Sequence, residues 1–140
     1  MAGAPARTLV IDESLDTRLA AELVRRGRRA ISVSSLGLRG SSDLDLLRGL
    51  DARLGSWVLV TADDQLPEDR ARWLSSPNGA VATINPEADS AWSLEAYRRE
   101  VLHRWAHAMQ VQERGTTRRY GLTNQRAWQP RLRRPRRRSS

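Results

Sequence analysis

Short apolar runs alternate with amphipathic segments through the first 84 residues of the chain. Residues 8–12, 30–33, 57–61 and 79–84 are uninterrupted runs of strand length, rich in small or β-branched side chains. Between them, leucines recur at helical spacing in residues 15–24 and 44–54. Gly27 and Gly55 follow these segments, where helix ends favour a residue that tolerates positive φ. Strands that alternate with helices predict a parallel sheet covered on both faces.

The second half of the chain predicts two further helices and a basic tail. Pro67 and Glu68 favour the first turn of a short helix that ends near residue 74. A longer helix is expected over residues 90–113, with one apolar stripe made of Leu94, Tyr97, Val101, Trp105 and Ala108. We therefore predict a three-layer α/β/α fold with a four- to five-stranded parallel sheet, a domain over residues 1–113 and a tail over 114–140.

The composition excludes several classes of protein. All 24 basic residues are arginine, so no mechanism that needs a lysine is available, and no cysteine is present to form a disulfide or a thiolate zinc site. The first eight residues hold no apolar run of signal-peptide length, and no segment has the roughly 18 apolar residues of a membrane span. We expect a cytoplasmic protein with no membrane partner.

The net charge of +8 is unevenly distributed. Residues 114–140 hold 10 arginines and no acid, whereas residues 1–113 hold 14 arginines and 16 acids. The tail is expected to be disordered alone and attracted to polyanions. Tyr120 and Trp128 could stack on single-stranded bases, although Trp128 could equally cover a core edge. A solubilising tail is the alternative to RNA contacts by its arginines, which include Arg118, Arg119, Arg133, Arg134, Arg136, Arg137 and Arg138.

Carboxylates follow two of the predicted strands and begin one of the predicted helices. Asp12 and Glu13 end the first strand, Asp63 and Asp64 follow the third, and Asp43 begins the helix between them. Ligands of open parallel sheets bind at the carboxyl ends of the strands, so these acids are expected to converge there. Taken singly, each acid has an ordinary explanation as a helix cap, a dipole partner or an Asx turn.

Converging carboxylates repel one another unless a cation lies between them, and oxygen ligands select hard ions such as Mg²⁺ or Mn²⁺. Several chemistries on such a sheet are excluded. A receiver domain needs a lysine, a haloacid dehalogenase needs a DxDxT loop, and no glycine-rich nucleotide-binding motif is present. Metal-assisted hydrolysis of a phosphodiester remains.

Two stretches, LVIDESLDTRLAAELVRRGRRAISVSSLGLRGSSDLDLL and WVLVTADDQL, resemble the short PIN-like domain family. Members of that family typically read DENLP near the first strand, then LGL and SD, then VLVT followed by acids. The resemblance covers about residues 8–66, roughly half of the chain. It implies a PIN-like fold and a metal-dependent ribonuclease, and many bacterial members are toxins that a cognate antitoxin protein neutralises.

By position, the resemblance implies that Asp12, Asp43 and Asp63 are the metal ligands. Thr61 takes the threonine position of the VLVT motif and would support these ligands through its hydroxyl. Asp64 would stand in for a fourth acid, because Gln65 and Leu66 replace the family's usual acid and phenylalanine. The implied mechanism is in-line attack on RNA by metal-activated water, with Glu13 or Asp64 orienting that water. The alternative is a catalytically degenerate PIN-like protein that binds nucleic acid without cleaving it.

The last predicted helix carries two further candidate features. His103 and His107 lie four residues apart, a spacing that suggests a metal pair, but they fall away from the apolar stripe and are expected on a solvated face. The apolar residues between 94 and 111 could instead form a homodimer contact.

Overall fold

Five parallel strands form one sheet in the computed structural model, which describes residues 7–62, 76–84 and 93–122. Their spatial order is β2-β1-β3-β4-β5. The strands are β1 (Thr8–Ile11), β2 (Ala30–Ser32), β3 (Trp57–Thr61), β4 (Gly79–Ile84) and β5 (Thr117–Tyr120). The predicted α/β class with a parallel sheet is confirmed.

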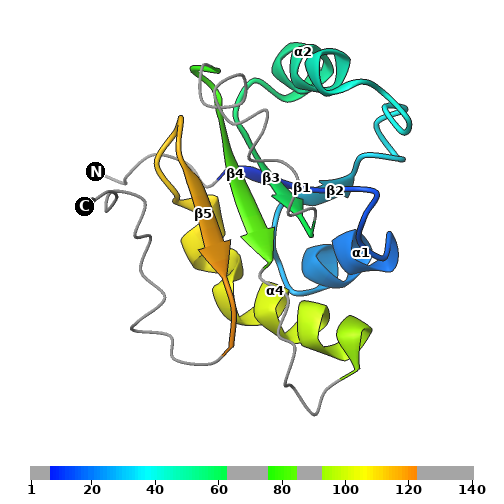
Figure 1. Ribbon diagram of the computed structural model, residues 1–140, viewed down its shortest axis with the longest axis vertical. Helices are drawn as coiled ribbons and strands as arrows, with labels where there is room; N and C mark the ends of the chain where they lie inside the picture. The colour runs from blue at the N-terminus through cyan, green and yellow to red at the C-terminus, as the bar shows by residue number, and fades with distance from the viewer. Residues whose placement is uncertain (1–6, 63–75, 85–92, 123–140) are drawn as a thin grey trace, which may run out of the picture.

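Helices cover both faces of this sheet (Figure 1). Helices α1 (Arg18–Arg25) and α4 (Leu94–Gln110) pack on one face, and α2 (Asp43–Leu54) packs on the other. The strand period of two explains the division, because Leu9 and Ile11 face α1 and α4 whereas Val10 faces α2. The three-layer arrangement is therefore also as predicted.

Helix α4 differs from its prediction in length and in its buried face. It begins at Leu94 and ends at Gln110, and Leu94 is 51% exposed. Of the predicted stripe, Tyr97 and Val101 are buried and Trp105 and Ala108 pack half-buried against the same core, so Leu94 is the one member that leaves it. The buried face is wider than the stripe, since the buried residues of α4 are Tyr97, Val101, Leu102, Ala106, Met109 and Gln110. None of the described helices is long and apolar enough to cross a membrane.

Strand β5 corrects the predicted boundary between domain and tail at residue 113. Thr117–Tyr120 pairs in parallel with β4 at the edge of the sheet. Gln112 fixes the approach to the strand, since its Nε2 donates to the Val81 carbonyl at 2.9 Å and its Oε1 accepts from the Tyr120 hydroxyl at 2.8 Å. The domain therefore extends beyond residue 113. The predicted helix over 67–74 and the rest of the tail lie outside the described residues.

The amino ends of β3 and β4 meet in a close contact between Trp57 and Gly79. A Cβ on Gly79 would lie 2.2 Å from Cζ2 of Trp57, so only glycine allows the fully buried indole to lie there. The indole Nε1 donates to Asp51 Oδ1 at 2.9 Å, and the Ser76 hydroxyl donates to the same oxygen at 3.1 Å. This contact fixes the placement of β3, whose other end carries Thr61.

Candidate active site

The carboxyl ends of β1 and β3 lie at the switch point of the sheet. The chain passes from β1 to β2 through α1, which covers one face of the sheet. It then passes through α2, on the opposite face, to β3, which pairs with the other side of β1. The order 2-1-3-4-5 is a common doubly wound order, and its ligand sites lie outside the carboxyl ends of β1 and β3. Asp12 directly follows β1, and Thr61 is the last residue of β3.

Asp12 is held in place by two hydroxyl groups. Its backbone N–H donates to the Val60 carbonyl at 2.9 Å, which continues the pairing of β1 with β3. Its Oδ2 accepts hydrogen bonds from Thr61 Oγ1 at 2.9 Å and from Ser14 Oγ at 2.7 Å. Thr61 is only 1% exposed, so its hydroxyl is a fixed donor. The side-chain hydrogen bonds from the described residues all reach Oδ2, and none of them engages Oδ1.

Ser14 is a site residue that the sequence reasoning missed. Its hydroxyl donates to Asp12, accepts from the Ala62 N–H at 3.1 Å and lies 3.3 Å from Thr61 Oγ1. The neighbouring Asp16 makes no hydrogen bond with this group, and its Oδ1 accepts from the N–H of Arg18, the first residue of α1, at 2.9 Å. The spacing Asp-x-Ser, typical of an Asx turn, was the available signal, and the weak Ser14 N–H contact to Asp12 Oδ2 fits that turn.

Glu13 connects the end of β1 to the loop before α2. Its Oε1 accepts from the Gly40 N–H at 2.9 Å, and Gly40 has a φ of 78°. Three residues later α2 begins at Asp43, with the Ser42 hydroxyl accepting from the Asp45 N–H at 3.2 Å as its cap. The half-buried Asp43 is thus at the same edge of the sheet as Asp12, as the sequence predicted.

The remaining predicted acids cannot be placed. Asp63 and Asp64 lie outside the described residues, as do Gln65 and Leu66. Over residues 7–62, 76–84 and 93–122, no group of three or more histidines, aspartates or glutamates is placed to hold a metal ion together. The sharing of one ion by Asp12, Asp43 and Asp63 therefore stays a prediction.

Asp16 is a nearby acid that is engaged in an ion pair. Its carboxylate lies 2.6 Å from the Arg18 guanidinium, on the exposed side of the first turn of α1. Hydrogen bonds from Arg18 lower the pKa of Asp16 to about 2. Its charge is therefore already balanced by Arg18, which sets it apart from Asp12.

His103 corrects the prediction of a solvated histidine face on α4. Its side chain is 10% exposed, and Nε2 lies 3.1 Å from Glu22 Oε1 on α1. Arg99 donates to the same carboxylate at 3.0 Å, and hydrogen bonds from Arg99 and His103 lower the pKa of Glu22. Since α1 and α4 pack side by side, His103 joins the two helices, whereas His107 is exposed as predicted.

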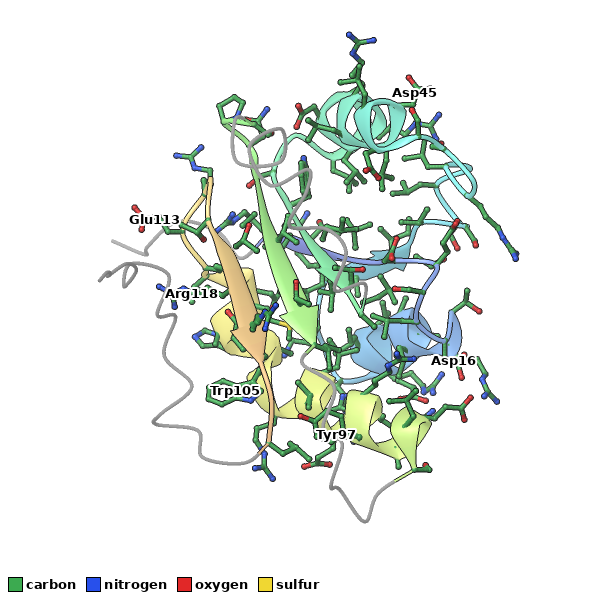
Figure 2. The ribbon with its side chains drawn as sticks, in the orientation of Figure 1. Asp16, Asp45, Tyr97, Trp105, Glu113 and Arg118 are labelled. Carbon is green, nitrogen blue, oxygen red and sulfur yellow. The ribbon has the colours of Figure 1, made fainter. Side chains whose placement is uncertain are left out.

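Two of the predicted nucleic-acid contacts on β5 are exposed and one is buried. Arg118 and Arg119 are exposed, and the arginines from 133 onward lie outside the described residues, as does Trp128. Tyr120 packs in the core with its ring 5.7 Å from that of Trp105, which lies beside β5 in Figure 2. Burial raises the pKa of Tyr120 to about 12, and its hydroxyl binds Gln112. The prediction that Tyr120 stacks on bases is therefore wrong.

The comparisons with known proteins add no relative to this picture. No family model matches the chain, and neither the curated proteins nor the solved structures gave a match. The likeness to PIN-like domains consequently rests on the sequence motifs in residues 8–66 and on the fold class.

Proposed function

We propose that this protein is a metal-dependent endoribonuclease of PIN-like type that cleaves RNA phosphodiesters at the carboxyl ends of β1 and β3. One observation carries the proposal: Asp12 sits at the switch point of the sheet with its carboxylate oriented by Thr61 and Ser14. A carboxylate held rigidly at that position is the arrangement expected of a cation ligand.

The donors at this edge suit a hard divalent ion. They are carboxylate and hydroxyl oxygens, and Mg²⁺ or Mn²⁺ prefers such ligands. Mg²⁺ usually keeps several waters and needs one or two carboxylates besides the substrate phosphate. In this proposal Asp12 and Asp43 would be enough protein ligands for such an ion. Asp63 would join them according to the resemblance. When bound, the ion supplies an activated water and neutralises charge on the phosphoryl group.

The protein's own residues position the reacting groups. Thr61 and Ser14 fix the orientation of Asp12 by binding Oδ2. Glu13 holds the loop that leads into α2, and so sets the position of Asp43 relative to β1. A water on this edge would be oriented by Glu13 or by Asp64, as the sequence suggested. No protein nucleophile is needed for in-line hydrolysis.

The cleavage test uses the full chain with a labelled RNA of mixed sequence in Mg²⁺ or Mn²⁺. EDTA should stop cleavage, and Asp12→Asn should lower its rate by at least about a hundredfold, because a lost ligand costs more than a lost ligand-orienting group. Asp45→Asn is the matched control, since Asp45 is exposed in the first turn of α2. It should cleave like the unchanged chain.

The same test decides between cleavage and the alternative. RNA binding without any cleavage, unchanged by EDTA and by Asp12→Asn, would identify a PIN-like protein that only binds nucleic acid. The toxin role belongs to this proposal on the strength of the resemblance. Expression in a bacterial host should arrest growth, Asp12→Asn should relieve that arrest, and the product of an adjacent antitoxin gene should relieve it too.

A further inference from the structure

Six arginines gather at the edge of the sheet where the strands begin, opposite the carboxylates. Helix α1 runs from the carboxyl edge to this amino edge and ends in a basic turn that leads into β2. Arg7 precedes β1, and the turn after α4 that leads to β5 carries Arg114. The six residues, here called the amino-edge arginines, are Arg7, Arg25, Arg26, Arg28, Arg29 and Arg114.

Gln110, the last residue of α4, joins two of the chain segments that carry these arginines. Its Oε1 accepts from Arg28 Nη1 at 3.2 Å, and its Nε2 donates to the Arg7 carbonyl at 3.0 Å. Its own carbonyl accepts from the Arg7 N–H at 3.5 Å. Gln110 is 3% exposed, so these contacts are anchored in the core at the end of α4. The basic turn, the start of β1 and the end of α4 are thereby held together.

The amino-edge arginines outnumber the acids at this edge, six to two. Within the described part of the chain, none of the amino-edge arginines forms a salt bridge. Burial and the charge of Arg114 lower the pKa of Arg7, and Arg7 Nη1 is buried without a hydrogen-bond partner among the described residues. Residues 1–6 and 123–140, which flank this edge in sequence, contain no acidic side chain.

Two carboxylates belong to the amino edge, and neither forms a salt bridge within the described residues. Asp51 accepts hydrogen bonds from Trp57 and Ser76. Glu113 is exposed and directly precedes Arg114, so it can offset one of the six charges at most. The helix dipole explains a cation in the last turn of α1, namely Arg25, but not arginines on two other segments. An anion from outside the chain would relieve the repulsion.

We propose that the amino-edge arginines bind the phosphate backbone of a nucleic acid, at a surface separate from the carboxylate edge. The span fits this ligand. From β2, which follows the basic turn, to β5, which follows Arg114, is four strand spacings, roughly 19 Å, which is the length of about five to six phosphates along one strand. Guanidinium groups match phosphate oxygens with two parallel hydrogen bonds.

Other polyanions fit the surface less well. On the described segments of this edge, the main exposed apolar side chains are Val24 and Val111, and valine is a short side chain. A membrane surface usually requires aromatic or larger apolar anchors beside the basic residues. A nucleic acid needs only phosphate contacts, and without base-reading groups the binding should be independent of sequence.

The test compares two double variants that carry the same charge, both made in the Asp12→Asn chain and measured in EDTA so that no cleavage can occur. Arg25→Gln with Arg29→Gln alters the amino edge, and Arg48→Gln with Arg104→Gln alters exposed positions on α2 and α4. The probe is a fluorescein-labelled 20-nucleotide poly(U) strand, followed by anisotropy. The amino-edge variant should bind the strand at least about tenfold more weakly near 0.1 M salt. The slope of a plot of log Kd against log salt concentration should also fall by about 1.4, because two phosphate contacts are lost.

The control variant should bind like the parent chain, apart from a small change that follows from net charge. Equal weakening in the two double variants would overturn the proposal. So would a preference for vesicles with one quarter phosphatidylserine, or for polyglutamate, over poly(U). Thermal unfolding checks that both variants fold, and Arg26→Gln with Arg114→Gln provides a second amino-edge pair if the first does not. Because cleavage is disabled throughout, the result is independent of the ribonuclease assignment.

Discussion

Replacing Thr61 by valine tests whether the site depends on the hydroxyl that orients Asp12. Valine has nearly the same shape as threonine, so the buried position stays filled while the donor to Asp12 Oδ2 is removed. Thr83 offers a matched control, because it lies opposite Thr61 in the register of β3 and β4 and is buried to 5% exposure. Its hydroxyl makes no hydrogen bond within the described residues, so Thr83→Val removes an equivalent group without touching Asp12.

The expected difference follows from the kind of bond that is lost. A hydrogen bond to a charged group contributes about 1.5–3 kcal/mol, and the buried donor cannot be replaced by water. Ser14 still binds Asp12 in the variant, so a loss of about 1.5–2 kcal/mol in the free energy of unfolding is expected for Thr61→Val. For a domain of this size that is a fall in Tm of roughly 6–8 °C. Thr83→Val should change the free energy of unfolding by no more than about 0.5 kcal/mol.

Urea unfolding followed by circular dichroism measures both variants, with equal slopes showing that the same surface is exposed on unfolding. A double-mutant cycle with Asp12→Asn isolates the pair, and the coupling energy should be about 1 kcal/mol or more. If Thr61→Val costs no more than Thr83→Val, or if the cycle shows no coupling, the hydroxyl does not orient the carboxylate. The structural argument for a rigid ligand at the switch point would then fail.

Three further predictions concern the frame around the site. Gly79→Ala should lower the free energy of unfolding by about 3 kcal/mol or more, because the added Cβ meets the Trp57 ring. Gly49→Ala is the control and should be nearly neutral, because its Cβ meets only the end of the Leu38 side chain and alanine favours the helix. Urea unfolding measures both variants. The raised pKa of Tyr120 means that the unfolded chain loses this proton first. Stability should therefore fall between about pH 10 and pH 12, and Tyr120→Phe should flatten that fall in thermal unfolding. Because the pKa of Glu22 is lowered on folding, its carboxylate stabilises the fold at pH values above its ordinary pKa of 4.5. This stabilisation should be lost as the pH falls below 4.5, and Glu22→Gln should remove that loss in acid unfolding.

The central strands could be predicted because each is a continuous apolar run between turn residues. Trp57–Thr61 and Gly79–Ile84 match their predicted limits, and both are buried along their whole length. Strand β5 could not be found in the same way. Its sequence TRRY has two exposed arginines and one buried side chain, so its hydrophobic pattern is too weak, and the hydrogen bonds of Gln112 that hold it come from outside the strand. Edge strands commonly carry such charges.

Part of the candidate site could be predicted from topology alone. Carboxyl ends of parallel strands share one edge, so the sequence predicts Asp12, Asp43 and Asp63 there, and the structure has Asp12 and the start of α2 at that edge. The contacts of side chains depend on rotamers and on helix packing, which spacing does not determine. The role of Ser14 was therefore missed, and His103 was predicted as a solvated residue, although the neighbouring helix supplies its partner Glu22.

The position of β5 has a consequence for any shortened form of this protein. A chain that stops at residue 113 would lack the last strand and leave GAVATI, six buried residues without a charge, with unpaired backbone groups. An uncharged, flat strand of that kind is a template for aggregation, and the arginines that follow Thr117 act as gatekeepers against it. Removal of the basic tail for crystallisation or assay should therefore start after Leu122.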